Sequence, residues 1–428
     1  MIRNSFVLCY YKPLRGLLQL KKNYKNLWLT TILPFGLGYF INMVFRSVNA
    51  VLAHPIMEDL SLDHVQIGFI TSTFVLAFAF TQIPLGIIVD SWGARKTQVS
   101  FFVVAGLGII MFGLSSSVAF LSISRAILGI GMAGSLIAAV KAITDRVDSE
   151  KIPYYTGIIL AFGGVGALVA TTPAKLFQLE FGWRNLCFVL GAITFLIAIL
   201  IFIVNKDDKV GDESESFSEN IKGLISVYKN SFFWRISPLL IFSLGGFIAM
   251  QGLWLGPWLD HVVGFTHLES ANYLLVIAVS MIFGFLSGGL FSKIASKLGL
   301  SLATIVVIGI GIHILTQILI ILNLFTLHYF IWFIFGYFAQ VTLVNYSILA
   351  QHFGPKISGR ALTAANILVF LFAFVVQYLF GVVVHYWPRL TGSNIKDGFK
   401  VGLSVLVLLE LIALIWYVLF RPSSKPKY

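Results

Sequence analysis

Charged residues are scarce in this 428-residue sequence: Asp, Glu, Lys and Arg make up 11% of it, whereas hydrophobic residues make up 58%. Soluble globular proteins carry about 25% charged residues, so lipid rather than water must surround most of this chain. A membrane-spanning helix needs roughly 20 apolar residues, and the chain has room for about a dozen. The composition therefore excludes an ordinary soluble domain and predicts an all-α polytopic membrane protein.

Cysteines and catalytic motifs are also scarce. The two cysteines, Cys9 and Cys187, fall on opposite sides of the membrane in the topology below, so no disulfide is expected. Neither H-E-x-x-H nor G-x-x-x-x-G-K-[ST] occurs, and the eight histidines are expected to be scattered over both faces. These absences argue against a membrane-embedded enzyme and against ATP-driven transport. We expect no metal and no other cofactor.

The apolar runs predict the topology. Residues 1–26 are polar and basic and lack the short apolar core and cleavage site of a signal peptide, so we expect a cytoplasmic arm. Twelve helices are predicted after it, at 27–53, 64–90, 97–114, 118–143, 154–178, 183–204, 233–259, 269–292, 300–322, 327–350, 358–386 and 399–420. The expected order is the arm (1–26), a six-helix bundle (27–204), a cytoplasmic linker (205–232), a second six-helix bundle (233–420) and a cytoplasmic tail (421–428).

The distribution of positive charge agrees with this alternation. Most of the 30 lysines and arginines fall on the side of the N-terminus. Five fall on the opposite side, namely Lys175, Arg184, Arg389, Lys396 and Lys400, and two, Arg46 and Arg125, fall inside predicted spans. Because cytoplasmic loops carry the excess of Lys and Arg, both termini are predicted to be cytoplasmic.

The two bundles form a weak internal repeat. Proline, glycine and a charged residue recur at nearly the same spacing in each, as Pro55, Gly86 and Asp90 and as Pro257, Gly289 and Lys293. Two six-helix halves related in this way are typical of secondary transporters, whose substrate site lies between the halves near the middle of the membrane.

The connection between the second and third predicted helices has the form G-x-x-x-D-x-x-G-x-[RK]-[RK]. Its residues are Gly86, Asp90, Gly93, Arg95 and Lys96. With the twelve spans and the two halves, this pattern resembles the major facilitator superfamily over nearly the whole chain.

Two further segments are similar to the same family, namely Arg125 with Gly129 and Gly131 in the fourth helix, and Gly182-Trp183-Arg184 before the sixth. The resemblance implies alternating access, with the five residues from Gly86 to Lys96 as a gating motif and Asp145 as a candidate partner of Arg95. The second-half copy departs from the pattern at Lys293.

Arg46 is the sharpest candidate for binding a solute. Tyr39, Asn42, Arg46 and Asn49 recur at helical spacing, so they share one face of the first helix. A charge inside a span is costly and usually faces a cavity or a partner. The alternative is a structural arginine that is bonded to backbone carbonyls or to another helix.

Arg125 is expected at the same depth, since each arginine lies about 10 Å below the outer surface at a rise of 1.5 Å per residue. No Asp or Glu lies inside the first six spans to neutralise either of them. Two unpaired arginines favour an anionic or carboxylate-bearing solute. Alternatively, Arg125 organises the fourth helix.

The second half offers Gln251 and Trp254 near the repeat equivalent of Arg46, and these residues would add a hydrogen bond and an aromatic wall. Glu410 in the last helix and His313 in the ninth are ionisable, but a structural role is favoured for both. Coupling to protons therefore stays open.

The sequence as a whole predicts a secondary active transporter, a symporter or antiporter, that moves a small organic solute, anionic or carboxylate-bearing, by alternating access. The alternatives are a transporter of peptides or other zwitterions, and a non-transporting receptor or scaffold with the same fold. We expect a monomer in the lipid bilayer of a bacterial inner membrane, with a small-molecule substrate and no nucleic-acid partner.

Overall fold

A computed structural model describes residues 27–148, 151–205, 217–288, 290–291, 297–324 and 328–420. The side chains of residues 153, 217–220, 328, 355 and 356 are not described. Several features expected from the sequence lie outside the described residues, namely the N-terminal arm, Cys9, Gly289, Lys293 and the C-terminal tail.

The described chain is almost entirely helical. In the first half the helices are η1 (Trp28–Ile32), α2 (Leu33–Ser47), α3 (Asn49–Leu60), α4 (His64–Leu114), α5 (Val118–Met132), α6 (Ser135–Thr144), α7 (Ile152–Val169), α8 (Thr172–Phe181) and α9 (Trp183–Val204). The first predicted helix thus continues past residue 53, through Pro55, to Leu60.

The second half repeats this pattern of long helices with short breaks. Its elements are α10 (Phe217–Tyr228), α11 (Ser231–Ala249), η3 (Met250–Trp254), α12 (Leu255–Trp258), η4 (Leu259–Val263), α13 (His267–Leu286), α15 (Leu302–Leu322), α16 (His328–Ala339), η5 (Gln340–Leu343), α17 (Val344–Thr391) and α18 (Ile395–Leu419).

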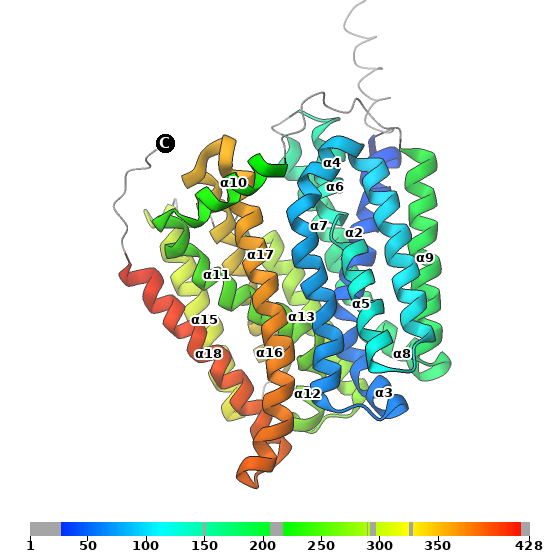
Figure 1. The fold of residues 1–428 in the computed structure, drawn as a ribbon. Coiled ribbons are helices and arrows are strands. Elements are labelled where there is room, and N and C mark those ends of the chain that lie inside the picture. The colour runs from blue at the N-terminus through cyan, green and yellow to red at the C-terminus, as the bar shows by residue number, and fades with distance from the viewer. Residues whose placement is uncertain are drawn as a thin grey trace, which may run out of the picture.

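The number of membrane passes agrees with the predicted twelve. Within the described residues, ten helices are long and apolar enough to cross a membrane, and the bent pair α7–α8 makes an eleventh. The 51-residue α4 counts once among the ten, although it rises to a bend and returns (Figure 1). Taken as two passes, α4 brings the total to twelve, and the predicted fold class is confirmed.

The bend in α4 lies in the predicted gating motif. Gly93 has φ 79° and ψ 164°, a conformation that glycine adopts without the clash a Cβ would cause. At its other end α4 begins with a capping box, in which the Asp63 side chain accepts a hydrogen bond from the Gln66 backbone N–H at 2.8 Å. The polar cap at Asp63 thus marks the start of the first span in α4, and Gly93 marks the bend between that span and the next.

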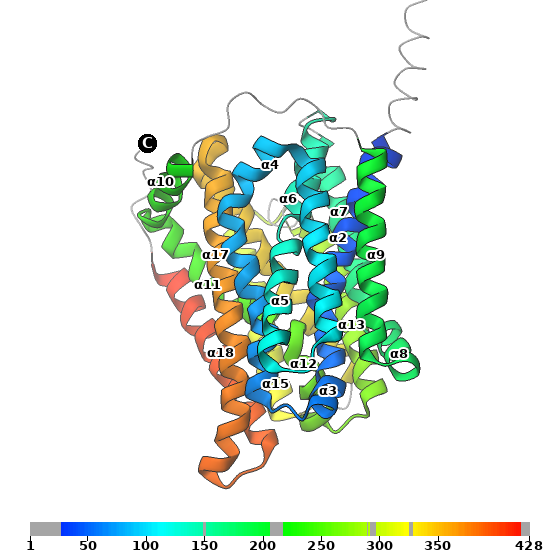
Figure 2. The ribbon, with the colours of Figure 1, turned by 45° about the vertical axis from the view of Figure 1, so that its right-hand side comes forward.

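The helices form one elongated bundle with two opposite ends. Figures 1 and 2 place α10 and the bend of α4 at one end, and α3, α8 and the turn between α17 and α18 at the other. We call these ends the α10 face, which is expected to be cytoplasmic, and the α3 face. The predicted halves lie side by side, with α5 and α9 in one and α11, α15 and α18 in the other.

The bundle exposes apolar side chains along its sides. Ile203 on α9 is 71% exposed and Leu408 on α18 is 56% exposed. Exposed apolar side chains of this size are unfavourable in water and favourable in lipid.

Candidate functional site

Arg46 lies between the two halves near the middle of the bundle. Its guanidinium carbon is 6.0 Å from the ring centre of Phe78 on α4 and 5.1 Å from that of Phe370 on α17. The two rings lie 4.5 Å apart. Among the described residues Arg46 makes no ion pair, and its one hydrogen-bond contact is with the sulfur of Met43 at 3.7 Å. The arginine is therefore held by aromatic faces, and its charge is not neutralised by a carboxylate.

Two tyrosines complete the surroundings of Arg46. The phenol groups of Tyr39 on α2 and Tyr346 on α17 lie close enough to interact electrostatically with the guanidinium. The Tyr346 hydroxyl donates a hydrogen bond to the Asn366 side-chain oxygen at 2.6 Å. The surroundings of this cation therefore come from α2, from α4 and from α17 on either side of its kink at Gly354, so they include both halves of the chain.

The asparagines predicted on the Arg46 face are buried, and Asn42 fastens helices to one another. Its amide nitrogen donates to the carbonyl oxygen of Met132 at 2.6 Å and to the Ser135 hydroxyl at 3.0 Å. These partners flank the break between α5 and α6, so Asn42 holds that break against α2. The side-chain oxygen of Asn49 is buried and has no hydrogen-bond partner in the described part of the chain.

Gln251 and Trp254 lie on the π-helix η3 but have different surroundings. The Gln251 amide donates to the Ser47 hydroxyl at 2.7 Å, one residue beyond Arg46 and across the two halves. Trp254 is fully buried, and its indole N–H donates to the Gln377 carbonyl oxygen at 3.0 Å. Gln251 therefore lies beside the Arg46 segment, whereas Trp254 packs toward the α3 face against Phe380 and His64.

Arg125 is separated from Arg46 in this arrangement. Its guanidinium carbon lies 4.5 Å from the ring centre of Phe112 on the returning arm of α4, and Cys187 on α9 is a further neighbour. The side chain is 1% exposed, and its Nε and Nη1 atoms have no hydrogen-bond partner among the described residues. The structure therefore places Arg125 inside the first half, although its depth suggested that it would share a site with Arg46.

The gating motif forms a charged cluster at the α10 face. Asp90 pairs with Lys141 of α6 at 3.6 Å, and the same Lys141 pairs with Asp145 at 3.3 Å. Arg95 donates instead to the carbonyl oxygen of Phe202 at 2.6 Å and lies over its ring. The structure thus gives Asp145 a lysine partner, because the bend at Gly93 directs Arg95 toward α9.

The remaining motif residues surround this cluster. Gly86 has open space where a side chain would be, and Lys96 is exposed. The motif therefore links the bend of α4 to α6 through Asp90 and to α9 through Arg95.

At the α3 face the two halves are closed against each other. A Cβ added at Gly256 on α12 would overlap the carbonyl oxygen of Ala50 on α3, so the two backbones touch. Thr172 of α8 donates to the Asn272 side chain of α13 at 2.9 Å. The space left between the halves there has room for about one water molecule.

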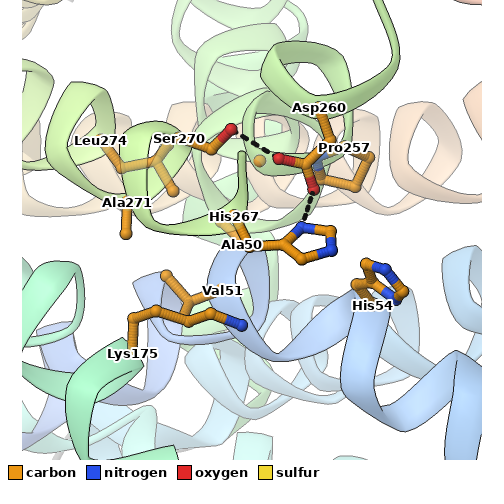
Figure 3. Close-up of a pocket in the computed structure, with 11 residues that line it drawn as sticks. Ala50, Val51, His54, Lys175, Pro257, Asp260, His267, Ser270, Ala271 and Leu274 are labelled. Atoms are coloured by element: carbon orange, nitrogen blue, oxygen red, sulfur yellow. Dashed lines mark hydrogen bonds and ion pairs between the residues drawn. The ribbon is translucent and has the colours of Figure 1, made fainter. Parts of the chain in front are cut away.

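The residues around this small space are ionisable. Figure 3 shows Lys175 and His54 of the first half facing Asp260 and His267 of the second. Lys175 is 4% exposed and donates to Gln178 at 2.8 Å. This cluster was not found from the sequence, because its members come from four separate segments that only folding brings together.

The expectation that histidines are scattered over both faces is wrong for most of those described. Five gather at the α3 face within reach of one another, namely His54, His64, His261, His267 and His385. Tertiary packing, not sequence spacing, brings them together. Among the described residues no three His, Cys, Asp or Glu side chains form a group that could hold a metal ion.

The Gly182-Trp183-Arg184 segment fastens α9 to α3 at the same face. The indole of Trp183 donates to the Asp59 carboxylate at 3.1 Å, and Arg184 pairs with the same oxygen. The hydrogen bond from Arg184 lowers the pKa of Asp59 below its ordinary value of 3.8. The carboxylate is thus kept in its charged form.

Glu410 has one defined partner. The Gln317 amide of α15 donates to its carboxyl at 2.8 Å, and the side chain is 2% exposed. It joins α15 to α18 within the second half, away from the aromatic rings that surround Arg46.

Comparison with known proteins identifies the family. The family model described as Major Facilitator Superfamily matches residues 35–377, which include Arg46 and the whole gating motif. The chain belongs to this family of membrane transporters. It is a multi-pass integral membrane protein, and its bacterial relatives agree with the expected bacterial inner membrane.

Two curated relatives carry descriptions of their solutes. The chain is 29% identical over 171 residues to a probable sulfoacetate transporter of Cupriavidus necator, a match that covers 40% of each protein. It is 23% identical over 429 residues to the hexuronate transporter of Escherichia coli, which covers 91% of this chain and 93% of the relative. The first match thus spans less than half of the relative, and the second spans nearly all of it.

A solved structure has the same fold. A bacterial homologue of the human lysosomal transporter Spinster, in an inward-facing and unoccupied conformation, superposes with a TM-score of 0.72 at 18% identity. The match covers 91% of this chain and 95% of that one. It supports the twelve-pass arrangement and gives no information about the solute.

Proposed function

We propose that this protein is a secondary transporter that moves a small organic anion across the membrane by alternating access. The main support for this proposal is the position of Arg46. This cation has no carboxylate partner in the described part of the chain, and it lies between the two halves, where its surroundings change when the halves move. An intramembrane charge of this kind is retained where it serves function, and a guanidinium matches a carboxylate or sulfonate through paired hydrogen bonds.

The neighbours of Arg46 suit an organic anion with a polar body. Tyr39, Tyr346 and Gln251 present hydroxyl and amide groups, while the rings of Phe78 and Phe370 lie beside the guanidinium. In such surroundings a charge-assisted hydrogen bond is stronger than in water. The two relatives described as sulfoacetate and hexuronate transporters are named for solutes of this class.

The two faces would act as gates on either side of Arg46. Closure at the α3 face leaves the α10 face as the route to the solute in this conformation. Asp90 and Lys141 would hold the arms around α4 and α6 in one arrangement and change partner when the α10 face closes. The orientation with the α10 face in the cytoplasm is part of the proposal and rests on the excess of lysine and arginine there.

A receptor without transport is the alternative. The described chain has no folded domain outside the bundle that could pass a signal on; α10 is the one helix described there. Two halves that meet around a central site are a feature of transporters in which one half rocks against the other.

The test is uptake by purified protein in liposomes. Radiolabelled glucuronate and sulfoacetate should accumulate in vesicles that contain the wild-type protein and not in empty vesicles. Arg46→Gln should reduce uptake to the level of empty vesicles while reconstituting equally well. Binding of these anions without flux would support the receptor instead, and flux that is unaffected by Arg46→Gln would contradict the role of the arginine.

A further inference from the structure

The contact between His54 and His267 joins the two halves at the α3 face. Their ring centres are 4.0 Å apart and the planes are nearly perpendicular, at 77°. His54 is on α3 in the first half, and His267 is the first residue of α13 in the second. Opening of this face must therefore separate these two rings.

Each ring also has a carboxylate in its own half. Glu58 lies one turn from His54, with Oε2 3.5 Å from Nδ1. Asp260 lies 2.9 Å from Nδ1 of His267 through its Oδ2 atom, and its Oδ1 atom accepts a hydrogen bond from Ser270 at 2.5 Å. Both histidines can therefore accept a proton beside a negative charge.

Lys175 supplies the attraction across the halves while the histidines are neutral. It is almost fully buried on α8, and its ammonium interacts electrostatically with Asp260 and with Glu58. Asp260 belongs to the other half, so this interaction favours the closed α3 face. Its strength depends on the negative charge of Asp260 remaining unneutralised.

We propose that the His54–His267 pair is a proton-binding site, and that protons bound there open the α3 face. Histidine is the side chain whose charge ordinarily changes between pH 5 and 8. Protonation of His267 neutralises Asp260 from within its own half, so Lys175 loses its partner across the interface. Protonation of both rings places two positive charges in contact from opposite halves, and they repel.

The other charged groups around the pair do not cancel this effect. Glu269 on α13 accepts hydrogen bonds from Thr266, so it caps its own helix. Among the described residues, the groups on the remaining sides are His261 on η4, His64 on α4 with Asp63 at its N-terminal cap, and His385 on α17, which contacts Arg389. None of these three histidines carries a negative charge, and Asp63 caps its own helix through Gln66, so these groups do not neutralise the repulsion between the two protonated rings.

This inference goes beyond the proposed function, and its test needs no solute. Spin labels at Leu179→Cys on α8 and Leu390→Cys on α17 report the distance between the halves at this face, since both positions are exposed. The native cysteines must not take up the label. Cys9 is replaced by serine for this purpose, and Cys187 can stay because it is buried. The protein is measured in nanodiscs by double electron–electron resonance at pH 7.5 and pH 5.5.

Acidification should increase the ratio of long to short distances by up to about 100-fold, because a net uptake of one proton changes the ratio about tenfold per pH unit and the two measurements are two units apart. In His54→Gln/His267→Gln the distances should stay short at both pH values. His352→Gln is the matched control, since His352 stacks on Phe232 near the α10 face, and it should respond like the wild type.

Asp260→Asn is a second variant, because it removes the attraction to Lys175 while both histidines are kept, although it also removes the carboxylate beside His267. It should already show the long distances at pH 7.5. Two results would overturn the proposal: equal distance distributions for the wild type at both pH values, or a pH response that persists in the double histidine variant. A protein that opens with pH but transports no anion would instead contradict the proposed function alone.

Discussion

The guanidinium of Arg46 lies 5.1 Å from the ring centre of Phe370, although the two residues are in different halves of the chain. The contact is one that any rocking of the halves must change. It therefore connects the predicted binding residue to the predicted motion. A solute that binds Arg46 in one conformation and not in the other can shift the equilibrium between them, since a ligand acts through its different affinities for two states.

The contact of Gly256 with Ala50 predicts how the α3 face can be forced open. Gly256→Ala would place a methyl group onto the Ala50 carbonyl oxygen, and overpacking of this kind costs about 1–3 kcal/mol. The cost falls on the closed state, so the ratio of closed to open molecules should decrease by about 5- to 150-fold. The distance between spin labels at Leu179→Cys and Leu390→Cys measures the change.

Gly246→Ala is the control for that experiment. Gly246 is also a helical glycine of the seventh predicted span, but its nearest neighbour, the Glu410 Oε1 atom, is 3.9 Å from an added Cβ. This variant should keep the short distance. If both glycine variants behave alike, close packing at Gly256 does not hold the α3 face closed.

Asp90 is predicted to bias the conformational equilibrium and to contribute little to stability. Its pair with Lys141 is partly exposed, with 60% of the Asp90 side chain accessible, and exposed pairs contribute about 0–1 kcal/mol. Asp90→Asn should therefore reduce anion uptake by about two- to fivefold, while membrane insertion and melting temperature change little. Uptake into proteoliposomes and thermal unfolding of the same preparation measure the two effects.

Asp148→Asn is a matched control for the Asp90 variant. It removes the same charge from another pair at the α10 face, between Lys151 and Asp148 at 3.4 Å, outside the gating motif. Uptake should be unchanged in this variant. If Asp90→Asn is expressed normally and takes up the anion as fast as the wild type, Asp90 has no role in gating.

The pair of Asp59 with Arg184 predicts an acid-sensitive contribution to stability. Because the hydrogen bond from Arg184 lowers the pKa of Asp59 in the folded protein, this contribution is present above the ordinary value of 3.8 and is lost as the pH falls through the lower folded value. The difference in melting temperature between the wild type and Asp59→Asn should be constant from pH 7 to pH 5 and should shrink below pH 4. A difference that grows on acidification would contradict the assignment.

The sequence predicted the passes and the gating connection because both depend on local properties. Apolar runs of sufficient length define the spans whatever their neighbours are, and Gly93 lies where a sharp bend between two spans needs it. Arg46 was identified for a similar reason, since a charged residue within an apolar run can be recognised in the sequence without knowledge of the fold. Its aromatic neighbours Phe78 and Phe370 were not found, because phenylalanine is common throughout this chain.

Depth along a helix could be predicted, whereas rotation about its axis could not. Arg125 was expected at the level of Arg46, but the structure turns its side chain toward Phe112 and Cys187, inside the first half. The contacts of Tyr346 and the gathering of His54 with His267 depend on which helices meet. A single sequence does not contain that information.

The most direct test of the account compares two ligands that differ in one charged group. Glucuronate and glucose share a pyranose ring, and glucuronate carries a carboxylate in place of a hydroxymethyl group. Their effect on the melting temperature of the purified protein measures binding to the native state. Arg46→Gln and Arg125→Gln are the paired variants, because both remove a guanidinium that lies over an aromatic ring and only Arg46 lies between the halves.

We expect glucuronate or sulfoacetate to stabilise the wild type and Arg125→Gln, and glucose to stabilise neither. Arg46→Gln should bind the anion about 30-fold more weakly, which corresponds to about 2 kcal/mol for a lost charge-assisted hydrogen bond. Equal stabilisation by glucose, or anion binding that is lost in Arg125→Gln and kept in Arg46→Gln, would contradict the claim that Arg46 recognises an organic anion.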